Sequence, residues 1–191
     1  MNKQYFTELA DIFQKIEVKD NKCKIISLDK AITQIVNLII NQSKKGNKVI
    51  FIGNGGSASI ASHMAVDFLK NAKIPAIAFN DPSLLTCISN DFGYEYVFEK
   101  PIEMLSKKGD ILFSISSSGK SKNILRATAM AKNKGCFVIT LSGFRHNNPL
   151  RKMGRINFFV PSFAYGHVEI SHLVVCHHIT DTIMSNKSPN G

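Results

Sequence analysis

The sequence predicts a single α/β domain: a doubly wound sheet of five parallel strands flanked by helices, preceded by further helices. Three observations indicate this fold. Several apolar runs of four or five residues lack polar alternation, as strands do when both of their faces are covered. Helical stretches separate these runs, and strands that alternate with helices form parallel sheets with right-handed crossovers. The length of 191 residues suits one domain.

Taken in order, the elements begin with an amphipathic stretch from Tyr5 to Ile16. A second stretch, Leu28 to Ile40, repeats its apolar residues at the helical period. We divide the chain into N-terminal helices (1–46), an α/β core (47–185) and a flexible tail (186–191). The strands of the core are expected at Val49–Ile52, Ala76–Phe79, Ile111–Ile115, Phe137–Leu141 and Phe158–Val160, and its helices at about 58–71, 94–106, 121–134 and 166–185.

Composition excludes several classes of protein. Apolar residues make up 44% of the chain and charged residues 20%, and no apolar run reaches the ~18 residues of a membrane span. The N-terminus lacks the apolar core of a signal peptide, and the four cysteines, without CxxC spacing, are expected to be buried and reduced. These features indicate a cytoplasmic protein without a membrane partner. The net charge of +10 suits an anionic partner such as a phosphorylated metabolite, whereas the scattered basic residues show no nucleic-acid signature.

Two loops follow predicted strands, at the sheet edge where α/β proteins bind ligands. The first is Gly53-Asn54-Gly55-Gly56-Ser57, in which glycines allow backbone amides to approach a ligand before a helix begins. It fits neither the GxGxxG nor the Walker pattern. The second contains Ser116, Ser117, Ser118 and Ser121, whose hydroxyls precede another helix start and suit a phosphate monoester. A tight connection and a helix cap are the simpler interpretations of these loops.

Ionisable residues form two further groups. His63 and Asp67 are four residues apart, so they share one face of the predicted helix 58–71. Four histidines and two carboxylates crowd the last predicted helix, and such a set suits a metal or acid–base site. A third loop, 89–94, contains Asn90 and Asp91, which suit either local capping or sugar hydroxyls. The crowded residues are His167, Glu169, His172, His177, His178 and Asp181.

Together these segments resemble the sugar isomerase (SIS) domain, and within it the phosphoheptose isomerases. The resemblance rests on IGNGGSASIASHMA, ISNDFGYEYVF, SISSSGKSKNI and VITLSGF and covers nearly the whole chain. It implies a five-stranded parallel sheet between helices, a homotetramer, and active sites at subunit interfaces.

The resemblance also implies roles for individual residues. The substrate would be bound by the loop Gly53–Ser57 (the glycine turn), by the loop that contains Ser116 to Ser121 (the serine loop) and by the pair Asn90 and Asp91. Zinc would be bound by four residues of two helices. Two of these four, Asp67 and His177, would also transfer protons. The implied substrate-binding residues are Asn54, Gly55, Gly56, Ser57, Asn90, Asp91, Ser116, Ser117, Ser118, Ser121 and Glu169, and the implied zinc ligands are His63, Asp67, Glu169 and His177.

Three departures from the family pattern stand out. Asp67 replaces a glutamate and is one methylene shorter, and Glu169 replaces a glutamine and adds a charge. The segment that usually reads TGRY has Leu69-Lys70-Asn71, without the arginine.

The implied activity is the conversion of sedoheptulose 7-phosphate to D-glycero-D-manno-heptose 7-phosphate through an enediol, for surface polysaccharide such as lipopolysaccharide or capsule. The departures leave two other classes open: a non-catalytic regulator that binds a protein such as a replication initiator, and a sugar-phosphate sensor.

Overall fold

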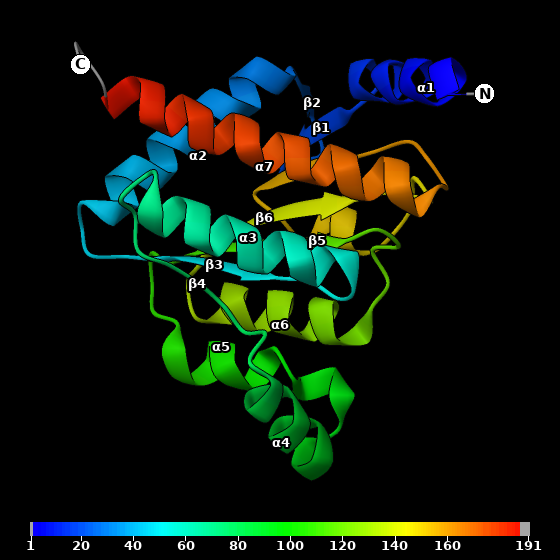
Figure 1. The fold of residues 1–191 in the computed structure, drawn as a ribbon. Helices are drawn as coiled ribbons and strands as arrows, with labels where there is room; N and C mark the ends of the chain where they lie inside the picture. The colour runs from blue at the N-terminus through cyan, green and yellow to red at the C-terminus, as the bar shows by residue number, and fades with distance from the viewer. Residues whose placement is uncertain (1, 188–191) are drawn as a thin grey trace.

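A computed structural model describes residues 2–187. Within this range the chain forms one seven-stranded sheet in the order β2-β1-β7-β6-β5-β3-β4, enclosed by helices (Figure 1). The strands β3 to β7 are parallel to one another, whereas β1 pairs antiparallel with both β2 and β7. The strands are β1 (Glu17–Asp20), β2 (Ile25–Ile26), β3 (Val49–Ile52), β4 (Ala76–Ala78), β5 (Ile111–Ser116), β6 (Phe137–Ser142) and β7 (Ile156–Phe159).

The five predicted parallel strands are confirmed, and their apolar sequences have the expected cause. In β3 every residue is buried, because successive side chains point to opposite faces and helices cover both. Val49 and Phe51 join the core on one face of the sheet. Ile50 and Ile52 join a second core on the other face.

Helices form the two outer layers (Figure 1). One layer, α2, α3 and α7, packs on the first core, and α1 lies against α7. The other layer consists of α4, α5 and α6 and packs on the second core. The helices are α1 (Asn2–Gln14), α2 (Leu28–Ser43), α3 (Gly56–Lys70), α4 (Pro82–Phe92), α5 (Glu99–Leu105), α6 (Lys122–Asn133) and α7 (Tyr165–Lys187), with short 3₁₀ turns η1 (Tyr94–Tyr96) and η2 (Leu150–Lys152).

The antiparallel hairpin β1–β2 was not predicted from the sequence. Both strands are short: β2 has only two residues, and β1 is mostly polar with only Val18 buried. The pairing of β1 with β7 along Glu17–Asp20 supplies its order, so the strand depends on a partner far away in the chain. The hairpin extends the predicted parallel sheet by two strands, because β1 pairs antiparallel with β7 and β2 pairs antiparallel with β1.

The segment between β4 and β5 also differs from the prediction. A helix, α4, occupies residues that were not assigned to one, and it includes Asn90 and Asp91 of the expected loop. The single helix expected at 94–106 is divided into η1 and α5. Pro101 explains the division, because a proline removes an amide donor and clashes with the carbonyl four residues earlier, so it suits only the first turn of α5.

The remaining expectations concern the chain end and the cysteines. Helix α7 runs to Lys187, so it includes the first two residues assigned to the tail, and residues 188–191 lie outside the described range. All four cysteines are free, but Cys23 and Cys87 are exposed, so their predicted burial is wrong. Between residues 2 and 187 no helix has the length and apolarity needed to cross a bilayer.

The connections create a switch point beside β3. From β3 the chain passes through α3 to β4 at the sheet edge, and it then returns to place β5 on the opposite side of β3. Ligands of open α/β sheets bind at the carboxyl ends of strands where the direction of winding reverses. The glycine turn follows β3 and the serine loop follows β5, so both lie at this point.

Candidate active site

The glycine turn and the serine loop line one cavity of about 430 Å³ at the switch point. Nine of the eleven predicted substrate-binding residues lie on its wall; Asn90 and Asp91 do not. The sequence interpretation missed Tyr165, which lines the cavity from the start of α7. The lining residues are Asn54, Gly55, Gly56, Ser57, Ser116, Ser117, Ser118, Ser121, Tyr165 and Glu169.

Gly55 and Gly56 in the glycine turn have different surroundings. Gly55 has a φ of 54°, a conformation that L side chains rarely adopt. Gly56 begins α3 beside α7, and a Cβ there would collide with the carboxylate of Glu169. The turn therefore brings the start of α3 close to α7, and it places Glu169 at the cavity.

The serine loop leaves polar groups available to a ligand. Ser121 is the N-cap residue of α6, yet its side chain makes no capping hydrogen bond. Ser117 is buried and its hydroxyl has no partner within the described chain. The Ser116 hydroxyl lies 3.4 Å from that of Ser121 and accepts from the Gly119 amide. Hydroxyls and free amides at a helix N-terminus suit a dianionic phosphate.

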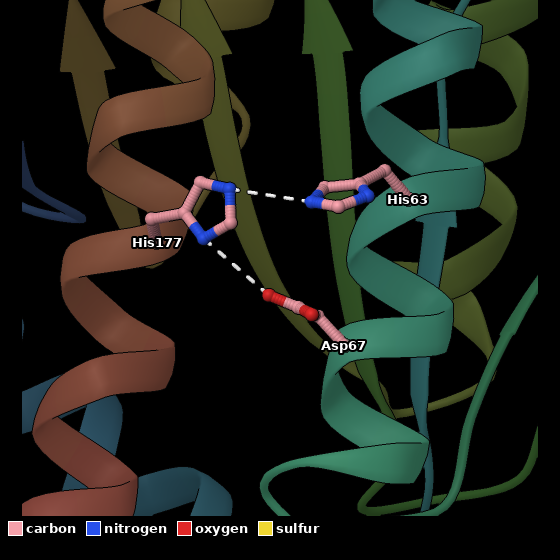
Figure 2. Close-up of side chains that lie close together, drawn as sticks. All are labelled: His63, Asp67 and His177. Atoms are coloured by element: carbon pink, nitrogen blue, oxygen red, sulfur yellow. Dashed lines mark hydrogen bonds and ion pairs between the residues drawn. The ribbon is translucent and has the colours of Figure 1, made fainter.

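His63, Asp67 and His177 form a second cluster, between α3 and α7 (Figure 2). His63 and Asp67 share one face of α3, as predicted, and His177 points toward both from α7. Its Nδ1 lies 3.4 Å from Asp67 Oδ2, and its Nε2 lies 3.3 Å from His63 Nε2. One ligand atom from each residue fits within 4.8 Å of the others, so the three could hold a metal ion.

Asn71 restrains the carboxylate of this cluster. Its Nδ2 donates a 2.7 Å hydrogen bond to Asp67 Oδ1, which leaves Oδ2 facing His177. Asn71 is the C-cap residue of α3 and follows the exposed Lys70. Asn71 belongs to Leu69-Lys70-Asn71, the segment that departs from the TGRY pattern. In this chain the segment therefore contributes a side-chain amide that binds Asp67 beside the cluster.

Glu169, the fourth predicted ligand, lies outside the cluster. It contacts the start of α3 at Gly56, eight residues before His177 on α7. The two helices run side by side in the same direction, because Glu169 faces Gly56 and His177 faces His63. The cluster therefore lies two helical turns, roughly 10–12 Å, along the helix pair from the cavity.

Asn90 and Asp91 are exposed near the end of α4. The Asn90 amide donates to Asp91 Oδ1 at 2.9 Å, so the pair is satisfied locally. The chain nevertheless returns to the cavity just beyond them, where the Tyr94 hydroxyl donates to Asn54 Oδ1 at 3.1 Å. The sequence places Tyr94 only in the loop 89–94, and no local sequence pattern predicts its contact with Asn54.

The other histidines of the last helix do not join the cluster. His167 is buried against the Tyr5 ring, and His178 is exposed. His172 is fully buried, with Nε2 3.2 Å from the Ser142 carbonyl oxygen. Burial lowers the pKa of His172 to about 4, although the hydrogen bond to Ser142 opposes this shift. His172 is therefore neutral near pH 7 and joins α7 to β6.

The fold and the two loops at its switch point define a SIS-domain protein, and the chain matches the SIS domain family over residues 4–143. The phosphoheptose isomerase of Helicobacter hepaticus is 38% identical over 174 residues, which cover 88% of each chain. That of Vibrio cholerae is 38% identical over 180 residues, covering 88% of this chain and 91% of the other. The chain belongs to the phosphoheptose isomerase family.

A solved structure supports the same assignment. Phosphoheptose isomerase GmhA from Neisseria gonorrhoeae superimposes with a TM-score of 0.82 at 29% identity. The match covers 94% of this chain and 96% of that one. The similarity therefore extends over nearly the whole fold.

Proposed function

We propose that the protein isomerises sedoheptulose 7-phosphate to D-glycero-D-manno-heptose 7-phosphate, a precursor for surface polysaccharide. The observation that carries this proposal is that the cavity lined by the serine loop reaches α3 and α7 at Gly56 and Glu169, and the same two helices hold His63, Asp67 and His177. An extended seven-carbon chain with bonds of about 1.5 Å, together with its phosphate ester, spans roughly 8–10 Å. With its phosphate in the serine loop, a sugar of this length could extend along α3 and α7 toward His63, Asp67 and His177.

The cavity residues would bind and orient the substrate. The serine loop and the N-terminus of α6 receive the phosphate, where the unpaired Ser117 hydroxyl supplies a donor. Asn54 and the amides of the glycine turn contact sugar oxygens. Glu169 accepts from a sugar hydroxyl beside Gly56.

The cluster would move the proton. Isomerisation transfers one hydrogen from C1 to C2 of the ketose and one from O1 to O2. One of Asp67 and His177 removes the C1 proton, the enediol forms, and the other group or the same base returns a proton to C2. His177 is suited to this exchange because its ring lies between the Asp67 carboxylate and the His63 ring.

The same cluster fits a zinc ion. Two imidazole nitrogens and one carboxylate oxygen are common zinc ligands, and catalytic zinc sites use three protein ligands and keep one position open. His63, Asp67 and His177 would hold the ion, with Glu169 as the fourth ligand only if its side chain leaves Gly56. When bound, zinc supplies positive charge to the substrate carbonyl and its developing oxyanion.

We propose further that the protein acts in the cytoplasm as a homotetramer. Asn90 and Asp91 are exposed and outside the cavity, so they would contact the sugar of a neighbouring subunit. Exposed apolar residues on α3, Val66 and Leu69, offer surface for such an assembly. The non-catalytic alternatives are not favoured, since the relatives that align over most of the chain are named as isomerases.

Proton NMR in D₂O tests the activity. Purified protein is incubated with sedoheptulose 7-phosphate, once with added zinc and once with a chelator. We expect an aldoheptose phosphate with deuterium beside the carbonyl, and less of it with the chelator. Asp67→Asn should abolish the exchange, whereas Asp181→Asn, an exposed carboxylate on α7, should not. Absence of both product and deuterium in every condition would refute the proposal.

A further inference from the structure

Asn123, at the start of α6, forms a reciprocal amide pair with Asn54 of the glycine turn. Asn54 Nδ2 donates to Asn123 Oδ1 at 3.0 Å, and Asn123 Nδ2 donates to Asn54 Oδ1 at 2.9 Å. Asn123 is buried, whereas Asn54 lines the cavity. The pair therefore joins the turn after β3 to the start of α6 beside the cavity.

The backbone determines which way this pair is oriented. The Ile124 amide donates to Asn123 Oδ1 at 2.9 Å, and a backbone N–H can only donate. The oxygen of Asn123 must therefore face Ile124, which turns its nitrogen toward Asn54. A rotated Asn123 amide would place two donors in contact and leave a buried oxygen unpaired, which is costly.

This orientation is passed on to Asn54. Its Oδ1 accepts from both Asn123 and the Tyr94 hydroxyl, so both of its lone pairs are used. Its Nδ2 carries two hydrogens and gives one of them to Asn123. The polar group that Asn54 retains for a ligand is thus one N–H.

We propose that Asn123 is a positioning residue that holds the Asn54 amide as a donor toward a substrate oxygen. The inference rests on the proposed isomerase activity for its substrate, but the orientation itself does not depend on turnover. Asn123 acts through Asn54, because Asn123 does not line the cavity. The ligand atom opposite Asn54 is an acceptor: a carbonyl, hydroxyl or phosphate oxygen of the sugar phosphate.

A double-mutant cycle tests the coupling. We expect Asn123→Ala to lower kcat/KM for sedoheptulose 7-phosphate about 10- to 100-fold, since a misplacement of about 1 Å can cost that much. In the Asn54→Ala background the same substitution should change kcat/KM less than about twofold, because its target is gone. Equal losses in the two backgrounds would overturn the inference and indicate a merely structural role.

Two further variants distinguish loss of the Asn54 orientation from loss of folding. Asn123→Asp has nearly the same shape but turns an oxygen toward Asn54 Oδ1, so it should lower kcat/KM in the same way. Asn133→Ala removes an exposed asparagine at the end of the same helix and should leave kcat/KM and Tm unchanged. An Asn123→Asp enzyme with full kcat/KM would contradict the proposal.

The side-chain amide signal of Asn54 separates this inference from the activity. In ¹⁵N-labelled protein without ligand, the signal is assigned by its disappearance in Asn54→Ala. We expect both of its protons to shift in Asn123→Ala and in Asn123→Asp, and to stay in place in Asn133→Ala. If the Asn54 signal does not move in Asn123→Ala, the inference is wrong even if the protein is an active isomerase. If the signal shifts but the wild-type protein has no isomerase activity, only the proposed activity is refuted.

Discussion

Single residues of the serine loop combine binding and stability in different ways. Ser114 lies in β5 and Ser117 directly follows this strand, and both are buried. The Ser114 hydroxyl pairs with that of Thr128 at 2.8 Å, behind the cavity. The Ser117 hydroxyl has no partner in the described chain and lines the cavity. A buried polar group without a partner is costly, and because Ser117 lines the cavity, a ligand or a water there could supply the missing partner.

Substituting these two serines should separate the effects. We expect Ser117→Ala to raise KM about tenfold or more, because a hydrogen bond to a charged group is lost, and to leave Tm unchanged or higher. Ser114→Ala should lower the free energy of unfolding by about 1 kcal/mol and leave KM unchanged. Steady-state kinetics and thermal unfolding check both variants. A Ser117→Ala enzyme with normal KM would exclude a phosphate contact.

Asn71 provides a second prediction at this scale. Partners that orient metal ligands typically contribute 10- to 100-fold to metal affinity. We therefore expect Asn71→Ala, which frees Asp67 Oδ1, to weaken zinc binding at least about tenfold. Lys70→Ala, the exposed neighbour, should bind zinc normally. Competition with a chromophoric chelator measures the affinity, and equal values for the two variants would show that Asn71 does not support the site.

Among the elements, α7 is joined to the sheet by a buried histidine as well as by its apolar residues. His172 bonds the end of β6, and burial lowers its pKa to about 4 from 6.5. Between pH 6.5 and pH 4, His172 is protonated in the unfolded chain but neutral in the folded chain. The free energy of unfolding therefore decreases as the pH falls from 6.5 toward 4. Above pH 6.5 both states are neutral and the histidine adds no pH dependence.

This coupling can be measured by urea unfolding. We expect His172 to account for a loss of about 2 kcal/mol in the free energy of unfolding between pH 7 and pH 5. His172→Gln should remove this part of the pH dependence, whatever its effect at pH 7. His178→Gln, on an exposed neighbour, should keep it. Parallel pH profiles for wild type and His172→Gln would contradict the assignment.

Some elements were predictable because their signals are local, and others were not. The strands β3 to β7 are mostly apolar and largely buried on both faces, which gives each a local signal. The strand β1 buries one residue and gains its order from β7, so its own sequence is uninformative. Helix α4 has an N-cap at Asp81 and a proline at its start, but among its residues only Ile88 is buried, which leaves a weak periodic signal.

At the scale of the whole molecule, most residues of the candidate site were named from the sequence, but the sequence did not predict that they lie in two separate places. The loop residues and the His63, Asp67 and His177 cluster follow from motifs and from resemblance. Their separation into a cavity and a cluster follows from the packing of α3 against α7, which no local pattern encodes. Tyr94 and Tyr165 reach the cavity through tertiary contacts and for the same reason escaped prediction.

The position of Asp91 leads to a prediction about assembly. Asp91 lies outside the cavity of its own chain, so we expect it to complete the site of another subunit. Asp91→Ala and His177→Ala should each be inactive when refolded alone. The two variants are then mixed in equal amounts, unfolded and refolded together. A site is intact only if one subunit supplies His177 and the neighbouring subunit supplies Asp91, so random mixing restores about a quarter of the sites, and about a quarter of the wild-type activity should return. His177→Ala refolded with wild type, which should keep about half of the activity, controls for mixing. A mixture that stays inactive while this control succeeds would mean that Asp91 does not serve a neighbouring subunit.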